Sequence, residues 1–257
     1  MSIDLTAKAY TPDKSRTYRL SIRECSDGFS FAVIDRSVGQ CMVLKHLETT
    51  IAADVLADSL LQQSYADVLL VTDNVAHVVI PHALYTSDGV AAFLPLDALQ
   101  RQRAQLAMCD LPDFEAIDVC NRRGCLAVPP TVGTVQYRHP LAQMALRAQQ
   151  TMRRIFYVDV QPQTTCLLVA DYHKLLLSNI VECHTDNDVA YYILATFQTL
   201  QLDVEQVPVL LSGRFDATLL QQLQQYVRSV HPVVPMADTQ WNTDFDGRYY
   251  PQFALML

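Results

Sequence analysis

The spacing of apolar side chains predicts a series of strands and a helix in the first part of the chain. Residues 18–25 alternate apolar and polar positions, which is the pattern of a half-buried strand, and residues 29–35 and 42–47 complete a three-stranded meander. From Thr49 the apolar positions change to the spacing of an amphipathic helix. Residues 68–72 then form a continuous apolar run, which is typical of a strand buried on both faces.

A later part of the chain predicts the same order of elements. Strand patterns cover residues 155–160, 165–170 and 175–182, a helix is predicted over 186–200, and 207–211 is the apolar run. The first strands, the helices and the buried strands of the two parts begin 137, 137 and 139 residues apart. A near-constant offset indicates two copies of one supersecondary unit. The predicted fold class is α/β, with two domains that each begin a mixed sheet with a three-stranded meander flanked by helices.

The remaining polar and apolar segments predict the domain boundaries. Residues 1–16 are polar and contain Pro12, so they are predicted to be a loosely held N-terminal arm. The first domain is predicted over residues 17–150 and the second over residues 151–257. The boundary falls in a helix predicted over residues 141–153.

Further elements are predicted between the copies and at the C-terminus. Residues 75–81 predict a strand, residues 96–108 a helix, and residues 116–120 and 125–128 the two arms of a hairpin. The aromatic and apolar tail over residues 241–257 predicts a final strand packed in a core, with an exposed partner-binding segment as the alternative.

Composition and charge narrow the classes of function. The net charge is −8 and no Lys/Arg cluster offers a footprint for a phosphate backbone, so nucleic-acid binding is not expected. No apolar run approaches the roughly 20 residues of a membrane-spanning helix, and the N-terminus lacks the apolar core of a secretory signal. The seven cysteines are odd in number and several lie in strand patterns, as buried thiols do. A cytoplasmic protein is expected.

Two polar motifs resemble metal sites, and neither predicts one. Cys120 and Cys125 have a usable separation, but zinc needs about four ligands and no second Cys or His pair is near in sequence. Asp186, Asn187 and Asp188 stand at the start of a predicted helix, where such residues act as caps. No metal ion is therefore expected.

The order of elements resembles the actin-like ATPase superfamily, which includes actin, the Hsp70 ATPase domain and sugar kinases. The resemblance covers roughly residues 18–235 and rests on element order more than on identities. The segment VLLVTDNVAHVVIPHALY is similar to the bacterial division and pilus-assembly members, and the whole chain resembles an uncharacterised bacterial family. The resemblance implies duplicated actin-like domains of the ribonuclease H-like type.

The resemblance also implies where a nucleotide site would lie. In active members two Asp-rich and Gly-rich hairpins hold the phosphates and magnesium, because glycine lets backbone N–H groups approach phosphate. A glycine pair in a third loop contacts the nucleoside. The residues at these positions are Asp27 and Gly28 in the first hairpin, Asp159, Thr164 and Thr165 in the second, and Gly213 in the third loop. Asp27 and Gly28 equally fit a solvent-facing hairpin turn.

The sequence departs from the family pattern at these loops. Gln161 and Pro162 stand where the second hairpin needs glycine, and proline has no N–H to donate. Gly213 is a single glycine where two are expected. Seven glycines among 257 residues is less than half of the average usage of about 7%. The nucleotide site is therefore predicted to be degenerate.

Three functional hypotheses follow. The first is a non-catalytic actin-like protein without a cofactor, which acts through protein–protein contacts as an adaptor, a scaffold or a homodimer. The second is an ATP-binding switch or phosphotransferase that binds ATP with magnesium and uses Asp159 as its catalytic or magnesium-organising carboxylate. The third is a module that binds an unrelated small molecule in the interdomain cleft, where such folds place ligands.

Overall fold

The computed structural model describes residues 3–73, 75–151, 153–235 and 241–257. Their strands are β1 (Ile3–Thr6), β2 (Tyr18–Cys25), β3 (Gly28–Asp35), β4 (Gln40–Leu47), β5 (Asp67–Thr72), β6 (His77–Pro81), β7 (Leu106–Leu111), β8 (Ala116–Asn121), β9 (Val135–Arg138), β10 (Ile155–Val160), β11 (Thr164–Asp171), β12 (Lys174–Glu182), β13 (Val209–Gly213) and β14 (Val230–Pro232). Their α-helices are α1 (Ala52–Leu56), α2 (Ala98–Gln102), α3 (Pro140–Gln149), α4 (Asp186–Thr199), α5 (Ala217–Leu223) and α6 (Tyr250–Phe253).

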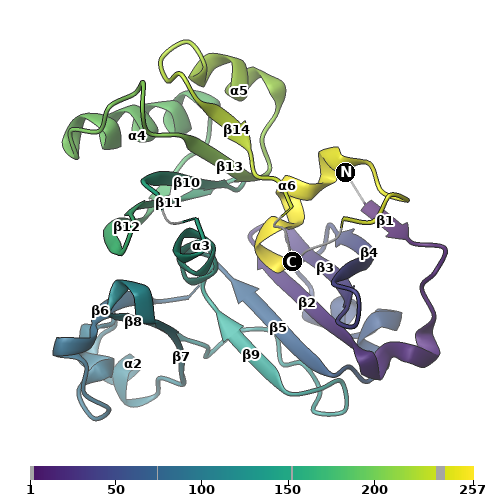
Figure 1. The fold of residues 1–257 in the computed structure, drawn as a ribbon. Coiled ribbons are helices and arrows are strands. Elements are labelled where there is room, and N and C mark those ends of the chain that lie inside the picture. The colour runs from purple at the N-terminus through teal and green to yellow at the C-terminus, as the bar shows by residue number, and fades with distance from the viewer. Residues whose placement is uncertain (1–2, 74, 152, 236–240) are drawn as a thin grey trace.

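These strands form three sheets, shown in Figure 1, with the orders β1-β4-β3-β2-β5-β9, β12-β11-β10-β13-β14 and β6-β8-β7. In the first sheet β2, β3 and β4 form an antiparallel meander, while β5 pairs parallel with β2 and β9 pairs parallel with β5. In the second sheet β10, β11 and β12 form the meander, and β13 pairs parallel with β10. The two sheets thus repeat one arrangement, and the mixed α/β class is confirmed.

The strand register shows which positions of the two repeats correspond. Arg23 in β2 lies opposite Val71 in β5, and Asp159 in β10 lies opposite Ser212 in β13. In both cases the opposing residue is the last but one of its strand. Arg23 and Asp159 are therefore equivalent positions of the repeat that carry opposite charges.

The third sheet differs from the sequence prediction. The helix expected over residues 96–108 is limited to α2, and residues 106–108 belong to β7. The hairpin expected from residues 116–128 does not form, because β8 pairs instead with β6 and β7, on its two sides. Cys120 therefore lies in the central strand of this sheet and Cys125 in the loop that follows it. The strand over residues 116–120 was correctly predicted, but its partners are β6 and β7, which precede it, and not residues 125–128.

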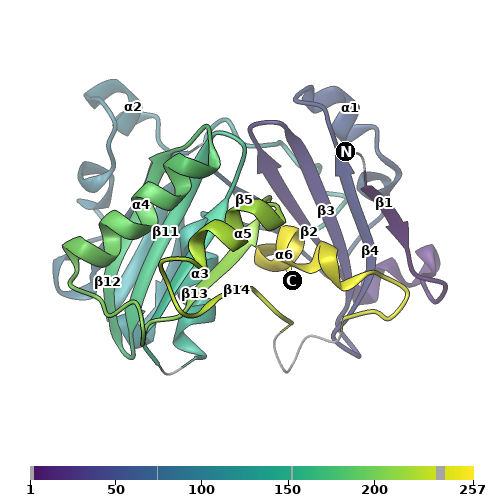
Figure 2. The ribbon, with the colours of Figure 1, turned by 90° about the horizontal axis from the view of Figure 1, so that it is seen from above.

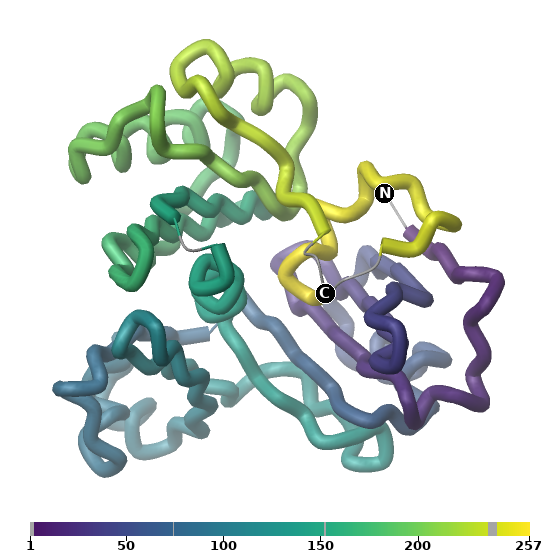
Figure 3. Tube along the Cα trace, viewed as in Figure 1, coloured from purple at the N-terminus to yellow at the C-terminus, as the bar shows by residue number. Residues whose placement is uncertain are grey.

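Both ends of the chain also differ from their predictions. The segment expected to be a loosely held arm contains β1, which pairs antiparallel with β4 at the edge of the first sheet. The C-terminal segment was expected to be a strand and is helical, with α6 between two 3₁₀ turns. It is packed in a core, as expected, since Phe253, Ala254 and Met256 are buried. Figure 3 shows this segment beside β1.

The cores lie on the faces of the two large sheets. The helices α4 and α5 cover one face of the second sheet, where Val158, Ile193 and Leu211 are buried. Its other face packs against α3 and against the C-terminal segment through Tyr250 and Leu255. Figure 2 shows α6 between the two large sheets. The C-terminal segment is therefore shared between the two repeats.

Candidate functional site

The ends of β2 and β10 bring Arg23 and Asp159 into direct contact across the two repeats. The Nη2 of Arg23 donates to Oδ2 of Asp159 at 2.5 Å and its Nη1 donates to Oδ1 at 3.2 Å. The two side chains are 1% and 0% exposed. A two-pronged contact between a guanidinium and a carboxylate is a strong form of ion pair, because two charged hydrogen bonds act in one fixed geometry.

The Asp159 carboxylate is held by two further donors from its own domain. Ser212 Oγ donates to Oδ1 at 2.7 Å, and Gln161 Nε2 donates to Oδ2 at 3.2 Å. Ser212 stands opposite Asp159 in the neighbouring strand β13, and Gln161 is in the turn after β10. Each carboxylate oxygen therefore accepts two hydrogen bonds.

Asp73 adds a second carboxylate to the Arg23 guanidinium. Its Oδ2 and Oδ1 lie 3.0 and 3.3 Å from Nη2 of Arg23. Burial raises the pKa of Asp73 to about 6, and the attraction of Arg23 only partly opposes this. Burial would lower the pKa of Arg23, but the Asp159 and Asp73 carboxylates raise it well above its ordinary value. Arg23 thus stays charged between two carboxyl groups.

A second contact between the repeats involves the first hairpin. Arg214, directly after β13, forms an ion pair with Asp27 in the turn between β2 and β3. Its Nη2 also lies 2.7 Å from Nε2 of His46, whose Nδ1 is 2.9 Å from Ser30 Oγ. Burial and the Arg214 charge lower the pKa of His46 to about 4, so this ring is neutral near pH 7. Asp73 after β5 and Arg214 after β13 again occupy corresponding positions with opposite charges.

The two glycines at the predicted phosphate loops lie where the backbone is crowded. A Cβ on Gly28, at φ +151°, would be 2.0 Å from the carbonyl oxygen of Leu47. A Cβ on Gly213, at φ +85°, would be 2.1 Å from the carbonyl oxygen of Val160. Close approach of neighbouring backbone is therefore sufficient to require glycine at both positions.

The other predicted site residues lie along the same junction. Asp159 is at its centre and Asp27 at its edge, whereas Thr164 and Thr165 begin β11. Thr164 closes the second hairpin, because its carbonyl oxygen accepts from the Gln161 N–H at 2.9 Å. Thr165 is fully buried. The structure thus brings Asp159, Asp27 and Gly213 to one junction and gives Thr164 a role in the turn.

Sequence reasoning missed Arg23 and Arg214, which bind the Asp159 and Asp27 carboxylates, and Asp73, which is the second carboxylate on Arg23. No local signal in the sequence joins Arg23 to Asp159, because aligning the ends of the first strands of the two copies places Glu24, and not Arg23, at the position of Asp159. Only the pairing register of the sheets makes Arg23 and Asp159 equivalent.

A cavity of about 890 Å³ lies beside Gly213. It is bounded by the loop from Arg214 to Ala217 and by Val233, Trp241 and Tyr250 from the C-terminal part of the chain. Within the described residues, no three His, Cys, Asp or Glu side chains gather as metal ligands would. No helix in the same residues has the length and apolar character needed to cross a membrane.

We compared the chain with known protein families and with proteins of curated function. The model of the family described as "Protein of unknown function (DUF3822)" matches residues 7–230. Among proteins of curated function, none matches the chain.

Several solved structures share its architecture. A crystal structure of a Bacteroides thetaiotaomicron protein with actin-like ATPase fold and unknown function is 19% identical, with a TM-score of 0.72 over 91% of this chain and 96% of that chain. A chain of the PilM-PilN type IV pilus biogenesis complex is 11% identical, with a TM-score of 0.64 over 94% and 97%. The ethanolamine utilization protein EutJ from Carboxydothermus hydrogenoformans is 10% identical, with a TM-score of 0.50 over 91% and 90%. The chain has the actin-like ATPase fold.

Proposed function

The chain belongs to the uncharacterised family DUF3822, and from that premise we propose that it is a non-catalytic actin-like protein. It acts through protein–protein contacts as an adaptor or scaffold in the cytoplasm, and a homodimer is one form that such contacts take. Fold alone does not establish this role, because one fold serves many functions. The proposal rests on the side chains at the junction of the two repeats.

The observation that carries the proposal is the position of Arg23. Its buried guanidinium joins Asp159 of the second repeat to Asp73 of the first. In the resemblance to active ATPases, Asp159 is the carboxylate that would organise magnesium or catalysis. Here a protein cation already neutralises it, and each of its oxygens accepts two hydrogen bonds.

The surrounding residues do not fit a magnesium-bound phosphate group. A phosphate cradle needs several backbone N–H groups that point into one space. In the second hairpin the N–H of Gln161 donates to the Thr164 carbonyl, and Pro162 has no N–H to offer. In the first hairpin, Asp27 is engaged by Arg214. These contacts support a degenerate nucleotide site.

The comparison with a pilus biogenesis complex supports a role in assembly. The PilM-PilN structure shows that a chain with this fold can be part of a protein complex. We extend to the present chain only the general property of forming a complex with another protein. The exposed side chains of its edge strands and helices provide the surface for such contacts.

Calorimetric titration of magnesium ATP into the purified protein tests the proposal. No binding heat is expected at millimolar ATP, for the native protein or for the Asp159→Ala variant. Micromolar binding that disappears in Asp159→Ala would contradict the proposal and favour the ATP-binding switch or phosphotransferase. Turnover of ATP that depends on Asp159 would contradict it equally.

A second candidate function rests on the cavity of about 890 Å³ beside Gly213. Trp241 and Tyr250 give it aromatic walls, which suit a small organic ligand. A screen of nucleosides and common metabolites by thermal shift tests this function. A ligand that raises the melting temperature of the native protein, but not of a Leu220→Arg variant at the cavity wall, would favour the small-molecule module over the adaptor.

A further inference from the structure

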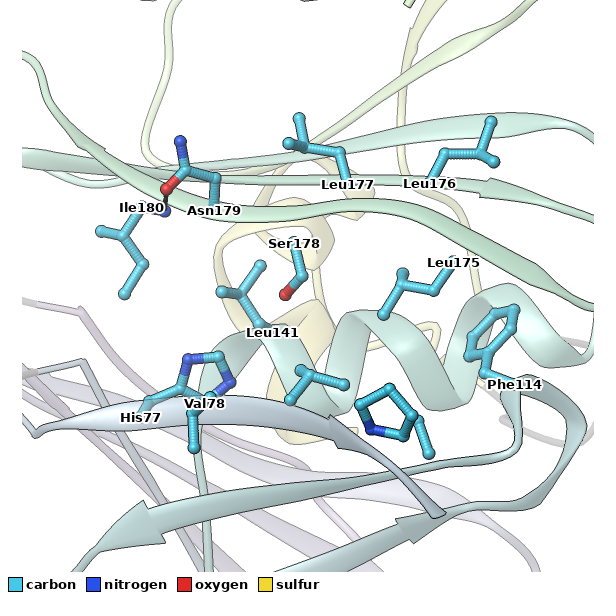
Figure 4. A pocket seen from close by; sticks show the side chains of 13 residues that line it. His77, Val78, Phe114, Leu141, Leu175, Leu176, Leu177, Ser178, Asn179 and Ile180 are labelled. Carbon is cyan, nitrogen blue, oxygen red and sulfur yellow. Dashed lines mark hydrogen bonds between the residues drawn. The ribbon is translucent and has the colours of Figure 1, made fainter. Parts of the chain in front are cut away.

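A slot with a volume of about 530 Å³ lies between the second sheet and the three-stranded sheet. Figure 4 shows β12 along one side of this slot, β6 along the other, and α3 behind them. Leu175, Ser178 and Ile180 come from β12, and Val78 comes from β6. Phe114 and Leu141 add further apolar surface. The slot is separate from the junction of Arg23 and Asp159.

Both strands that line the slot are edge strands. Among the described residues, β12 pairs with β11 and β6 pairs with β8, and each has one side without a neighbouring strand. Such a side presents main-chain donors and acceptors that can pair with another chain. The N–H of Ile180 shows this, because it donates to the side-chain oxygen of its neighbour Asn179 at 2.9 Å and not to β11. A bound strand could replace that local contact.

Charge along β12 is confined to its two ends. Lys174 begins the strand and Glu182 ends it, and the seven residues between them carry no charge. Edge strands are commonly protected from pairing by charged side chains along their length. Leu176 and Ile180 are instead exposed hydrophobic residues. The middle of β12 is therefore suited to an uncharged partner strand.

Ser178 adds a polar group within this apolar setting. Its hydroxyl is buried and has no hydrogen-bond partner. Figure 4 shows its side chain directed into the slot, on the same side as that of Leu175. A buried hydroxyl without a partner costs free energy that a ligand can recover by hydrogen bonding to it. A peptide group is one ligand that supplies both a donor and an acceptor.

We propose that this slot binds an extended peptide segment of a partner protein, which adds as a strand to the free edge of β12. The proposal rests on the adaptor function and names the surface that performs it. Five or six extended residues span about 17–20 Å, which matches the lengths of β6 and of the β12 residues that line the slot. The segment is apolar in its middle. An acidic residue near Lys174 and a basic residue near Glu182 complement the charges at the ends of β12.

A single peptide fits this position better than a second copy of the chain does. Paired with itself about Ser178, β12 would set Lys174 opposite Glu182, so its sequence alone permits such a dimer. However, β6 and α3 stand across the slot from β12. A second copy would have to bring β11 with its own β12, whereas a peptide brings one strand only. The geometry therefore favours the peptide.

Selection from a library of random nine-residue peptides displayed on phage tests the proposal. The selected peptides are expected to have apolar residues in the middle, and their affinity is measured by fluorescence polarisation. Ser178→Trp fills the slot, and Ile180→Pro removes an edge donor that β11 does not use. Both are expected to weaken binding at least tenfold. Tyr191→Arg, on the exposed surface of α4, is the matched control and should bind normally.

Hydrogen exchange locates the bound peptide and checks that the variants are folded. Bound peptide is expected to protect amides of residues 174–182. The proposal is overturned if no peptide is selected, if the selected peptides bind both slot variants normally, or if protection appears elsewhere. Concentration-dependent dimerisation that Ile180→Pro abolishes would overturn it in favour of pairing between two copies. The ATP titration is independent of all these results. If no peptide binds the slot and ATP gives no binding heat, the peptide proposal fails while the adaptor function stands and uses another surface.

Discussion

The guanidinium of Arg23 holds the two repeats together through a fully buried ion pair. Burying a charge costs several kcal/mol, and this cost is offset only when partners and hydrogen bonds replace water. Asp159 and Asp73 provide those partners at 2.5 and 3.0 Å. Removal of Arg23 would leave two buried carboxyl groups without a cation.

Arg23→Met is expected to lower the free energy of unfolding by about 3–5 kcal/mol, because Asp159 remains buried without its counter-charge. Urea denaturation measures the change. The double variant Arg23→Met with Asp159→Leu should recover much of the loss, since an apolar pair can replace a buried ion pair. Arg248→Met, at an exposed ion pair, is the control. A loss below about 1 kcal/mol in Arg23→Met would contradict this account of the junction.

Gly213→Ala is expected to destabilise the protein by about 2–4 kcal/mol, through the clash with the Val160 carbonyl and the left-handed backbone. Gly247→Ala is the matched control, because a Cβ there meets no atom within 4 Å. The melting temperatures of the two variants give the comparison. Equal melting temperatures would show that the backbone at Gly213 relaxes easily.

His139 is expected to make stability depend on pH. Burial, then the neighbouring His77 and Arg23, lower the pKa of His139 well below its ordinary value. The unfolded chain takes up a proton near pH 6.5 whereas the folded protein does not, so this contribution is complete above about pH 6.5 and is lost as pH falls. His139→Asn keeps an acceptor for the Leu141 N–H at the start of α3. Its unfolding free energy should fall less between pH 7 and pH 5 than that of the native protein, and an equal fall would exclude His139 as the cause.

At the scale of elements, the short C-terminal helix α6 shows how tertiary contacts stabilise a segment with little helical tendency of its own. It has four residues, far fewer than an isolated helix needs in water. Phe253 is fully buried beside Ala32, Cys41 and Leu44 of the first sheet. Tyr250 packs in the cluster that includes Tyr157 and Leu168 of the second sheet. The helix is therefore held by contacts with both repeats.

Phe253→Ala is expected to cost about 3–5 kcal/mol, because it removes a buried ring and leaves a cavity. Phe93→Ala is the control for loss of an aromatic side chain, since Phe93 is 45% exposed and should change stability by less than about 1 kcal/mol. Chemical denaturation of both variants gives the two values. Similar small losses would mean that α6 contributes little to the fold.

At the scale of the whole molecule, the apolar clusters and the ion pairs cross from one repeat to the other. One cluster contains residues of α3, β10 and the C-terminal segment, and another contains residues of β1, β3 and the same segment. Arg23–Asp159 and Arg214–Asp27 add polar contacts across the junction. The repeats are therefore expected to unfold together.

Urea unfolding followed by Trp241 fluorescence and by far-UV circular dichroism should give the same midpoint. Trp241 is the only tryptophan of the chain and packs in both clusters, so its fluorescence reports on the junction. Circular dichroism reports on the sheets and helices of both repeats. A midpoint that lies at lower urea by fluorescence than by circular dichroism would show that the junction opens before the repeats unfold.

The sequence by itself determined the repeated units. The strands β2, β3 and β4, and β10, β11 and β12, were recognised from short apolar patterns that are local to each strand. The order of these units was enough to predict the actin-like fold, which the solved structures confirm. The loop residues Asp27, Gly28 and Gly213 were also placed correctly in turns or at strand ends.

Only the tertiary structure decided which strands pair, which segments pack together and which charges meet. Residues 106–108, which begin β7, were predicted as the end of a helix, because a short apolar pattern fits either element and pairing with β8 selected the strand. The C-terminal segment is apolar in either a strand or a helix, and packing between two sheets selected the helix. Arg23 meets Asp159 although 136 positions separate them, because equivalent strand ends of the two repeats converge. Charge pairing across such a junction depends on distance in space, which no local pattern in the sequence contains.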